Sequence, residues 1–177
     1  MTRRILSLRI VFGFLVALFF SFAAYVTAWA LYVVRWHIEV DSISINDTVL
    51  GEPQYVDVAR RIHGNWEGGY RVTIRHQPEG YIFCDTGNVD VPYREFNDSG
   101  QPMALPDPMA LSYWAAGGTC SFLLAKNAPP MPVGLYSMET CHYVYAPLNV
   151  YPKKHLCWPT NIFRVYETTI DLIQRKP

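Results

Sequence analysis

The residues from Ile10 to Val34 form an apolar run of 25 positions that contains no charged side chain. A helix rises about 1.5 Å per residue, so a helix of this length covers roughly 37 Å, more than the roughly 30 Å hydrocarbon core of a bilayer. A helix buried in a soluble core is seldom so long. The run therefore predicts a transmembrane helix over 10–34, between a short basic tail, 1–9, and a single later domain, 36–177.

The charges around this run predict its direction. Arg3, Arg4 and Arg9 precede it, whereas Arg35 alone follows it directly, and the first acidic residue is Glu39. Positive charge beside a membrane helix tends to stay in the cytoplasm. We therefore expect a single-pass protein of the inner (cytoplasmic) membrane, with a cytoplasmic amino terminus and a periplasmic or extracellular domain.

A cleaved signal peptide is the alternative interpretation. The segment Ala28-Trp29-Ala30 has the small-x-small form that a signal peptidase accepts. The apolar region of a signal peptide spans about 7–15 residues, and this run is much longer and continues to Val34. A retained signal anchor is the favoured reading, and cleavage after Ala30 stays open.

The residues that follow Arg35 carry 11 Lys and Arg against 15 Asp and Glu, so the domain is acidic although the whole chain is neutral. No basic stripe is present, which argues against nucleic-acid binding. All 13 prolines lie here, and dense turn residues between segments rich in Tyr, Val and Ile are typical of β structure. The domain is long enough to bury one hydrophobic core.

Four cysteines lie after the apolar run, at Cys84, Cys120, Cys141 and Cys157. An even number on the exported side predicts two disulfides. The spacings of 36, 21 and 16 positions contain no close pair of the kind that a four-thiolate zinc site needs. A hairpin that turns between them would place Cys141 opposite Cys157, which leaves Cys84 for Cys120; a similar turn would also allow Cys120–Cys141.

Alternation of apolar and polar residues is clearest from Tyr70 to His76 and indicates a strand with one wet face. The chain predicts a glycine-rich turn over 63–69, a long loop over 88–108, and an element over 109–115 that the pattern leaves undecided between helix and strand. Strands are expected over 42–49, 54–62, 70–76, 81–84, 119–125, 133–145 and 162–169.

Seven or eight short strands without a long helix after the anchor predict a mainly β fold, an antiparallel β-sandwich of the immunoglobulin-like kind with two disulfides. Cys84 and Cys141 are spaced as sheet-bridging cysteines would be. Trp114 comes late after the first cysteine, and Glu139 stands where a tyrosine corner would be, so the sharper immunoglobulin marks are weak.

Catalytic signatures are sparse. Cys141 and His142 are adjacent in an expected strand, so their side chains point to opposite faces, and the chain has no G-x-S-x-G elbow. The histidines form no His-x-His or HExxH pair, so we expect no metal and no cofactor. Asp85 and Asp90, beside the long loop, are the carboxylates to inspect for glycan cleavage. Catalytic residues are predicted to be absent.

Aromatic side chains outside the anchor are numerous, and several fall in turns and loops where burial is difficult. Tyr and Trp bring large contact area with few rotatable bonds, which suits a binding surface. The final hairpin adds two lysines to an otherwise acidic domain. The predicted partner-binding residues are Trp66, Tyr93, Phe96, Tyr151, Lys153, Lys154 and Trp158.

These patterns favour a membrane-anchored, extracytoplasmic interaction module with a protein partner in the envelope, a role that an envelope factor or a phage-encoded membrane factor could fill. Two alternatives stay open. One is an envelope hydrolase that acts on glycan or peptide. The other is a small subunit of a membrane complex that acts through its helix, because Ala17, Ser21, Ala24 and Ala28 recur at helical spacing and permit close helix packing.

Overall fold

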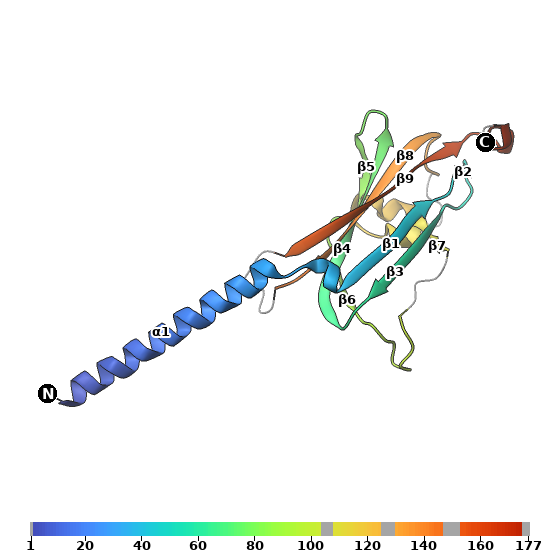
Figure 1. Ribbon diagram of the computed structural model, residues 1–177. Coiled ribbons are helices and arrows are strands. Elements are labelled where there is room, and N and C mark those ends of the chain that lie inside the picture. The colour runs from blue at the N-terminus through green and yellow to red at the C-terminus, as the bar shows by residue number, and fades with distance from the viewer. Residues whose placement is uncertain (1, 104–107, 125–129, 147–152, 175–177) are drawn as a thin grey trace. The chain divides into compact units, whose positions relative to one another are not determined.

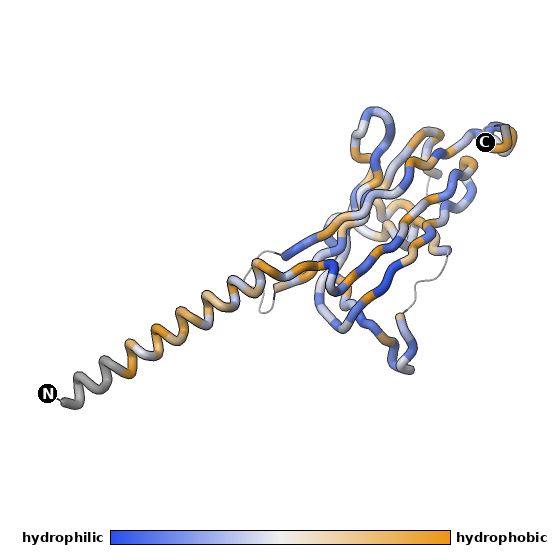
Figure 2. The backbone as a smooth tube through the Cα atoms, in the orientation of Figure 1, coloured by the Kyte–Doolittle hydropathy of each residue, from blue (hydrophilic) through white to orange (hydrophobic). Residues whose placement is uncertain are grey.

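The computed structural model describes residues 2–103, 108–124, 130–146 and 153–174, and it divides into two compact units that meet between Val33 and Val34. The first unit contains α1 (Thr2–Leu31), one continuous helix (Figure 1). Its 22 residues from Ile10 to Leu31 have a mean hydropathy of 2.3, and the helix is long and apolar enough to cross a membrane. Figure 2 shows this apolar stretch as an almost unbroken hydrophobic segment. The helix ends at Leu31, earlier than the predicted Val34.

The second unit is mainly β and contains two sheets. The smaller sheet has the order β1-β3-β7, and the larger has the order β2-β9-β8-β4-β5, with β6 also paired to β4. All pairings are antiparallel except β2 with β9. The strands are β1 (Ile38–Ile45), β2 (Thr48–Val49), β3 (Tyr55–Ile62), β4 (Trp66–Gln77), β5 (Ile82–Asp85), β6 (Val89–Tyr93), β7 (Met109–Ala110), β8 (Gly134–Val144) and β9 (Lys154–Tyr166).

Short helices complete the unit: η1 (Val34–Trp36) precedes β1, α2 (Leu111–Trp114) and η2 (Gly118–Leu124) follow β7, and α3 (Thr169–Gln174) ends the described chain. The mainly β class is therefore confirmed. The two sheets stay open, and the structure does not confirm an immunoglobulin-like order of strands.

One hydrophobic core receives side chains from both sheets. Core residues of the longer strands lie two positions apart, as the period-two pattern of a half-buried strand requires. Asn161 on β9 links the sheets at one end, because its side chain accepts from the backbone N–H of Ile45 and donates to the carbonyl of Ile45, both at 2.9 Å. The core includes Ile45 and Val56 from the smaller sheet and Val72, Ile74, Tyr136, Met138, Phe163 and Val165 from the larger.

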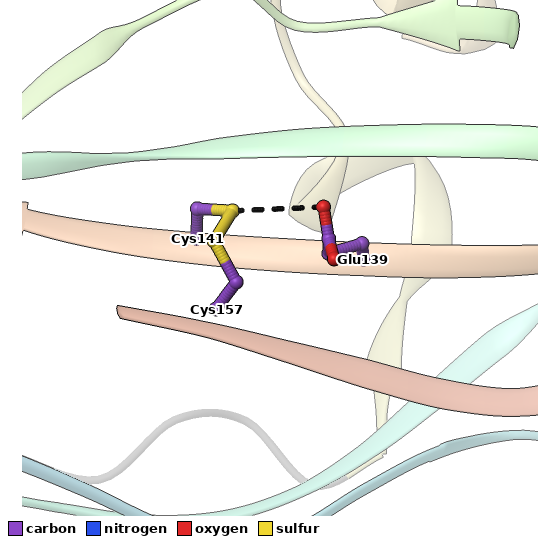
Figure 3. Close-up of side chains that lie close together, drawn as sticks. All are labelled: Glu139, Cys141 and Cys157. Atoms are coloured by element: carbon purple, nitrogen blue, oxygen red, sulfur yellow. Dashed lines mark hydrogen bonds between the residues drawn. A yellow bond between two sulfur atoms is a disulfide. The ribbon is translucent and has the colours of Figure 1, made fainter. Parts of the chain in front are cut away.

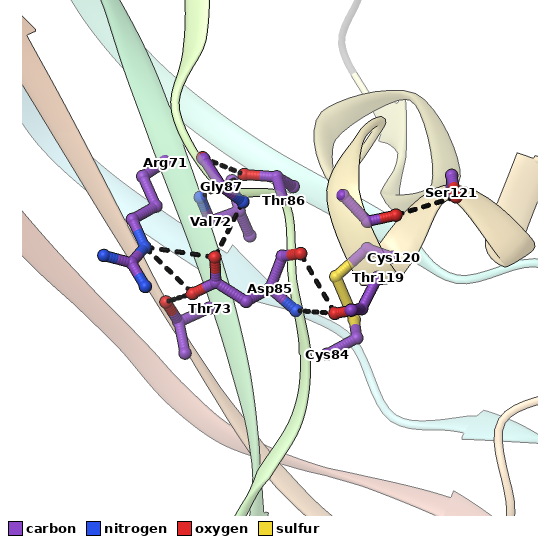
Figure 4. Close-up of a disulfide and its surroundings, with 11 residues drawn as sticks. Arg71, Val72, Thr73, Cys84, Asp85, Thr86, Gly87, Thr119, Cys120 and Ser121 are labelled. Atoms are coloured by element: carbon purple, nitrogen blue, oxygen red, sulfur yellow. Dashed lines mark hydrogen bonds and ion pairs between the residues drawn. A yellow bond between two sulfur atoms is a disulfide. The ribbon is translucent and has the colours of Figure 1, made fainter.

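The structure contains the two disulfides that the sequence favoured. Cys141 and Cys157 face each other directly in the β8–β9 register and are joined (Figure 3). Cys84 on β5 is joined to Cys120 in η2, with both residues fully buried (Figure 4). The first bond joins the two strands of the last hairpin, and the second holds η2 against the edge of the larger sheet.

The predicted glycine turn over 63–69 is wrong in its second half, because β4 already begins at Trp66. Gly68 and Gly69 belong to this strand and serve close packing. A Cβ on Gly68 would overlap the backbone carbonyl of Tyr143 and the ring of Trp66, and a Cβ on Gly69 would overlap the hydroxyl of the same tyrosine. Glycine permits such close approach as well as tight turns, so composition alone does not distinguish the two uses.

Three further expectations are corrected or resolved. The apolar segment 119–125 does not form a strand, since η2 covers it to Leu124 and the disulfide from Cys120 packs the short helix against the core. The expected loop over 88–108 contains β6, which pairs with the glycine-containing start of β4. The undecided segment 109–115 is divided between a two-residue strand and the single turn of α2.

Removing each disulfide separately tests its contribution to stability. The Cys141–Cys157 loop spans 16 positions and the Cys84–Cys120 loop 36. By the chain-entropy model the bonds contribute about 3 and about 4 kcal/mol, respectively. We expect Cys141→Ser/Cys157→Ser to lose less free energy of unfolding than Cys84→Ala/Cys120→Ala, which also disturbs the core. Urea denaturation of the full-length protein, followed by tryptophan fluorescence without reductant, measures both losses. Equal unfolding curves for wild type and either double variant would contradict this account.

Candidate functional site

A pocket of about 240 Å³ opens beside β3, β6 and α2 in the second unit. Apolar and aromatic side chains form most of its wall, and two arginines contribute the charge. Its residues come from five separate stretches of sequence, so the fold assembles it. The lining residues are Arg60, Ile62, Tyr70, Val91, Pro92, Tyr93, Arg94, Met103, Met109, Tyr113 and Trp114.

A second, larger hollow of about 560 Å³ lies beside β2 and the β7–α2 connection. Among the described residues that line it, Glu52 is the one ionisable side chain. Ligand sites combine an apolar wall with a few convergent polar groups. The smaller, aromatic pocket fits this description better, and we take it as the candidate site.

Stacked rings form the inner wall of the pocket. The β4–β6 register sets Tyr93 opposite Trp66, and their rings stack with centroids 3.9 Å apart. Tyr70, at an inward position of β4, stacks on Trp114 at 6.2 Å. The indole N–H of Trp114 donates to the hydroxyl of Thr140 on β8 at 2.9 Å. Contacts with Trp66 on β4 and with Thr140 on β8 therefore fix the orientation of the Tyr93 and Trp114 rings.

His142 supports this wall from behind. It is 1 % exposed, and its Nδ1 shares a hydrogen bond of 2.7 Å with the hydroxyl of Tyr93. The rings of Tyr70, Trp114 and Trp158 lie 5.7–6.4 Å from it. Burial lowers the pKa of His142 to about 3, and the positive charge of Arg60 adds to the effect. Burial also raises the pKa of Tyr93, so both groups are neutral near pH 7.

Arg60 is the charged group that distinguishes the pocket. It occupies an inward position on β3, with its guanidinium 5.3 Å from the centroid of the Trp114 ring. Burial lowers its pKa, yet an arginine in a protein stays protonated. No carboxylate and no hydrogen-bond acceptor among the described residues pairs with its side chain. Arg94, by contrast, donates to Glu67 at 2.9 Å and to the carbonyl of Tyr93 at 2.8 Å.

Two large apolar side chains at the rim are unusually exposed. Tyr113 on α2 is 70 % exposed, and Met103 is 50 % exposed. Single exposed apolar residues are common, but these two border the same aromatic pocket. A partner that enters the pocket would cover them as well. The arrangement can therefore hold an apolar group in the pocket, pair an anion with Arg60, and extend contact over the rim.

The structure scatters the predicted partner-binding residues. Of these, Tyr93 alone among the described residues lines the pocket. Trp66 and Tyr93 are both buried, so the expectation that they are difficult to bury is wrong. Phe96 is 51 % exposed, and Trp158 is half-buried beside His142.

The lysines of the last hairpin lie elsewhere. Lys153 and Lys154 are half-buried, and the ammonium of Lys153 lies 3.9 Å from the centroid of the Tyr143 ring, on the outer face of the larger sheet. Tyr151 lies outside the described residues. The pocket and the predicted hairpin surface are therefore different parts of the domain.

Asp85 and Asp90, the carboxylates singled out from sequence, are each held separately. Asp85 accepts from Arg71 at 2.9 Å and from the hydroxyl of Thr73 at 2.7 Å (Figure 4). Asp85 pairs with Thr73 on β4, and Asp90 pairs with Gly69, four residues earlier on the same strand. The two acids are therefore separated by about 13 Å along the strand. Glycosidase carboxyls lie within about 9.5 Å of each other, so this placement disfavours the pair as glycan-cleaving residues.

Asp90 instead belongs to a tyrosine cluster. The hydroxyls of Tyr143 and Tyr145 both donate to its Oδ1, at 2.6 and 2.5 Å. These hydrogen bonds, followed by the charge of Lys153, hold the pKa of Asp90 below its usual range. The carboxylate therefore stays ionised and joins β6 to β8 across the space left by Gly69.

One group of side chains among the described residues meets the distance requirement for a metal site: Glu139, Cys141 and Cys157 (Figure 3). The two sulfurs are joined to each other, so neither is a thiolate that could donate to a metal ion. The group then retains one carboxylate, 3.8 Å from the sulfur of Cys141. In its oxidised form it fits a disulfide with an acidic neighbour and does not fit a metal centre.

No family model matches the chain, and no curated protein and no solved structure gives a significant match to it. The site therefore has to be interpreted from its own chemistry.

Sequence reasoning missed Arg60, Tyr113 and Trp114, yet a signal for the first was present. In β3 the inward residues are Val56, Val58, Arg60 and Ile62, so a charged residue occupies a position where the alternation of the strand predicts an apolar one. His142 likewise occupies an inward position of β8 where an apolar residue would be expected. A polar residue at an inward strand position indicates a buried polar contact or a ligand. No comparable pattern marks Tyr113, because a single helical turn has no measurable period.

The buried histidine predicts acid sensitivity. The unfolded chain binds a proton on His142 near the ordinary histidine pKa of 6.5, whereas the folded protein does so only near pH 3. Stability from this group is therefore present above pH 6.5 and is lost as the pH falls toward 3. We expect the stability advantage of wild type over His142→Gln to shrink between pH 7 and pH 4, as measured by urea denaturation. Parallel pH curves would show that His142 is not held neutral.

Proposed function

We propose that this protein is a single-pass, membrane-anchored binding module whose β domain acts outside the cytoplasm, in the periplasm or at the cell surface. The observation that carries the proposal is the pocket itself: an assembled aromatic wall, an exposed apolar rim, and an arginine that contacts the Trp114 ring but pairs with no carboxylate among the described residues. The apolar helix supports the anchor, and the disulfides support an oxidising compartment.

The proposed orientation has the amino terminus in the cytoplasm and the helix in the inner membrane. Three arginines before the apolar run support it, because such charges resist translocation. The proposal further includes a protein partner in the envelope. An immunoglobulin-like sandwich remains our proposal for the finer architecture, supported by two facing sheets that share one core.

An envelope hydrolase has less support. Its two candidate carboxylates are separated along the sheet and engaged by different partners, and one of them is held by Arg71. A role that depends on the helix alone can be distinguished from binding through the domain by experiment, because it requires the particular helix sequence and not the pocket. Binding through the domain is the function that the described geometry supports best.

Thiol accessibility tests the orientation. All four cysteines lie after the helix, so export predicts that none is free in the folded protein. Intact cells are lysed under denaturing conditions without reductant and treated with a maleimide-polyethylene glycol reagent. We expect no adduct on the protein before reduction and four adducts after it. External protease on spheroplasts should remove the domain. Four free thiols without reduction, together with full protease protection, would place the domain in the cytoplasm and contradict the proposal.

Photo-crosslinking tests the pocket as the binding surface. We expect p-benzoylphenylalanine in place of Tyr113, in the full-length protein in its native membrane, to give a discrete crosslinked species. Tyr81 is a matched control, because it is 54 % exposed and lies in the β4–β5 turn, away from the pocket lining. Crosslinks of the same size and yield from both positions, or none from position 113, would contradict a binding role for this surface.

A further inference from the structure

We propose that the pocket binds a segment of a partner protein in which an aromatic side chain stands next to an acidic residue, with the ring in the pocket and the carboxylate on Arg60. This inference rests on the proposed function and names the chemistry that the same site recognises. Three independent features of the pocket carry it: its unpaired charge, its size and its rim.

The charge is the first feature. A guanidinium that is removed from water without an anion loses solvation that a cation–π contact only partly replaces. The Arg60 guanidinium contacts the Trp114 ring and pairs with no carboxylate among the described residues. Its neighbour Arg61 is different, since it faces away and pairs with Glu39 at 3.2 Å and Asp41 at 3.3 Å. A carboxylate from a ligand would give Arg60 the charge-assisted hydrogen bonds that it lacks.

Size and wall chemistry are the second feature. The volume of about 240 Å³ is below the roughly 300–1,000 Å³ of pockets that enclose drug-sized ligands. It suits one bulky side chain better than a cofactor. The rings of Tyr70, Tyr93 and Trp114 line the pocket, and aromatic pairs favour stacked and edge-on contacts. Met103 and Met109 add polarisable sulfurs that favour contact with a ring edge.

The rim is the third feature, and it favours a protein partner over a free small molecule. Tyr113 and Met103 project beyond the pocket with 70 % and 50 % of their surfaces exposed. An aromatic acid small enough to fill the pocket would leave them in water, whereas a polypeptide that continues past the anchoring side chain would cover them. Such an anchor in a pocket, surrounded by apolar contacts, is the usual form of a binding hot spot.

Methionine methyl groups provide a direct test, because two of the five methionines line the pocket. Met103 and Met109 report on it, and Met131 and Met138 in the core are internal controls. Full-length protein labelled with ¹³C at the methionine methyl groups, in nanodiscs of zwitterionic lipid, is titrated with the blocked tetrapeptide acetyl-Gly-Phe-Asp-Gly-amide. We expect the Met103 and Met109 signals to move and to saturate. The acetyl-Gly-Phe-Asn-Gly-amide and acetyl-Gly-Ala-Asp-Gly-amide peptides should bind at least about tenfold more weakly.

Matched variants separate charge recognition from folding. Arg60→Gln should reduce the affinity for the Phe-Asp peptide to that for the Phe-Asn peptide, whereas Arg61→Gln on the same strand should leave it unchanged. Unmoved Met131 and Met138 signals show that each variant is folded. Equal binding of the Phe-Asp and Phe-Asn peptides, or no effect of Arg60→Gln, would overturn the inference and leave Arg60 as an inward charge that discourages edge pairing.

Other outcomes distinguish this inference from the proposed function. If no peptide moves Met103 and Met109 while crosslinking at position 113 still captures a discrete partner, the aromatic-acid chemistry is wrong and the binding module stands. If nanodiscs with anionic lipid move the two signals without peptide, the pocket recognises lipid headgroups and the inference is overturned. If neither the peptides nor the crosslinker give a signal, both proposals fail.

Discussion

The hydrogen bond between Tyr93 and His142 connects residues 49 positions apart and joins β6 to β8 across the intervening β4. Both partners are buried, so leaving either one unpaired would cost about 1–3 kcal/mol. The bond holds the Tyr93 ring against Trp66, and together with Trp114 it defines the inner wall of the pocket. A neutral histidine is essential here, because a second positive charge close to Arg60 would be strongly unfavourable.

The two faces of the larger sheet have different roles. The inner face carries the aromatic cluster and the pocket, whereas the outer face carries the Cys141–Cys157 bond, the Asp85–Arg71 ion pair and the tyrosines on Asp90. Contacts on the outer face hold β4, β5, β6 and β8 in register, and this register positions the rings on the inner face. The domain can therefore present a fixed pocket although its sheets remain open.

Sequence patterns predicted much of the fold but little of the site. Alternation identified the core of β4, and strands were also expected where β3 and β8 lie. Hairpin spacing favoured the Cys141–Cys157 pair, because it depends on neighbours along the chain. Glycines at 68 and 69 were misread as a turn, since the rings that require them come from Trp66 and from Tyr143, which lies far along the sequence. The pocket joins residues between Arg60 and Trp114 from five segments, and only tertiary packing brings those together.

In the native membrane we expect a partner to cover this pocket. Hydroxyl-radical footprinting of the full-length protein tests it most directly, since the oxidation rate follows the exposure of individual side chains. We expect Tyr113 and Met103 to be modified several-fold more slowly in native membranes than in detergent-purified protein, and Tyr81, which is similarly exposed, to be modified at the same rate in both. Equal rates at Tyr113 and Met103 in the two preparations would contradict it.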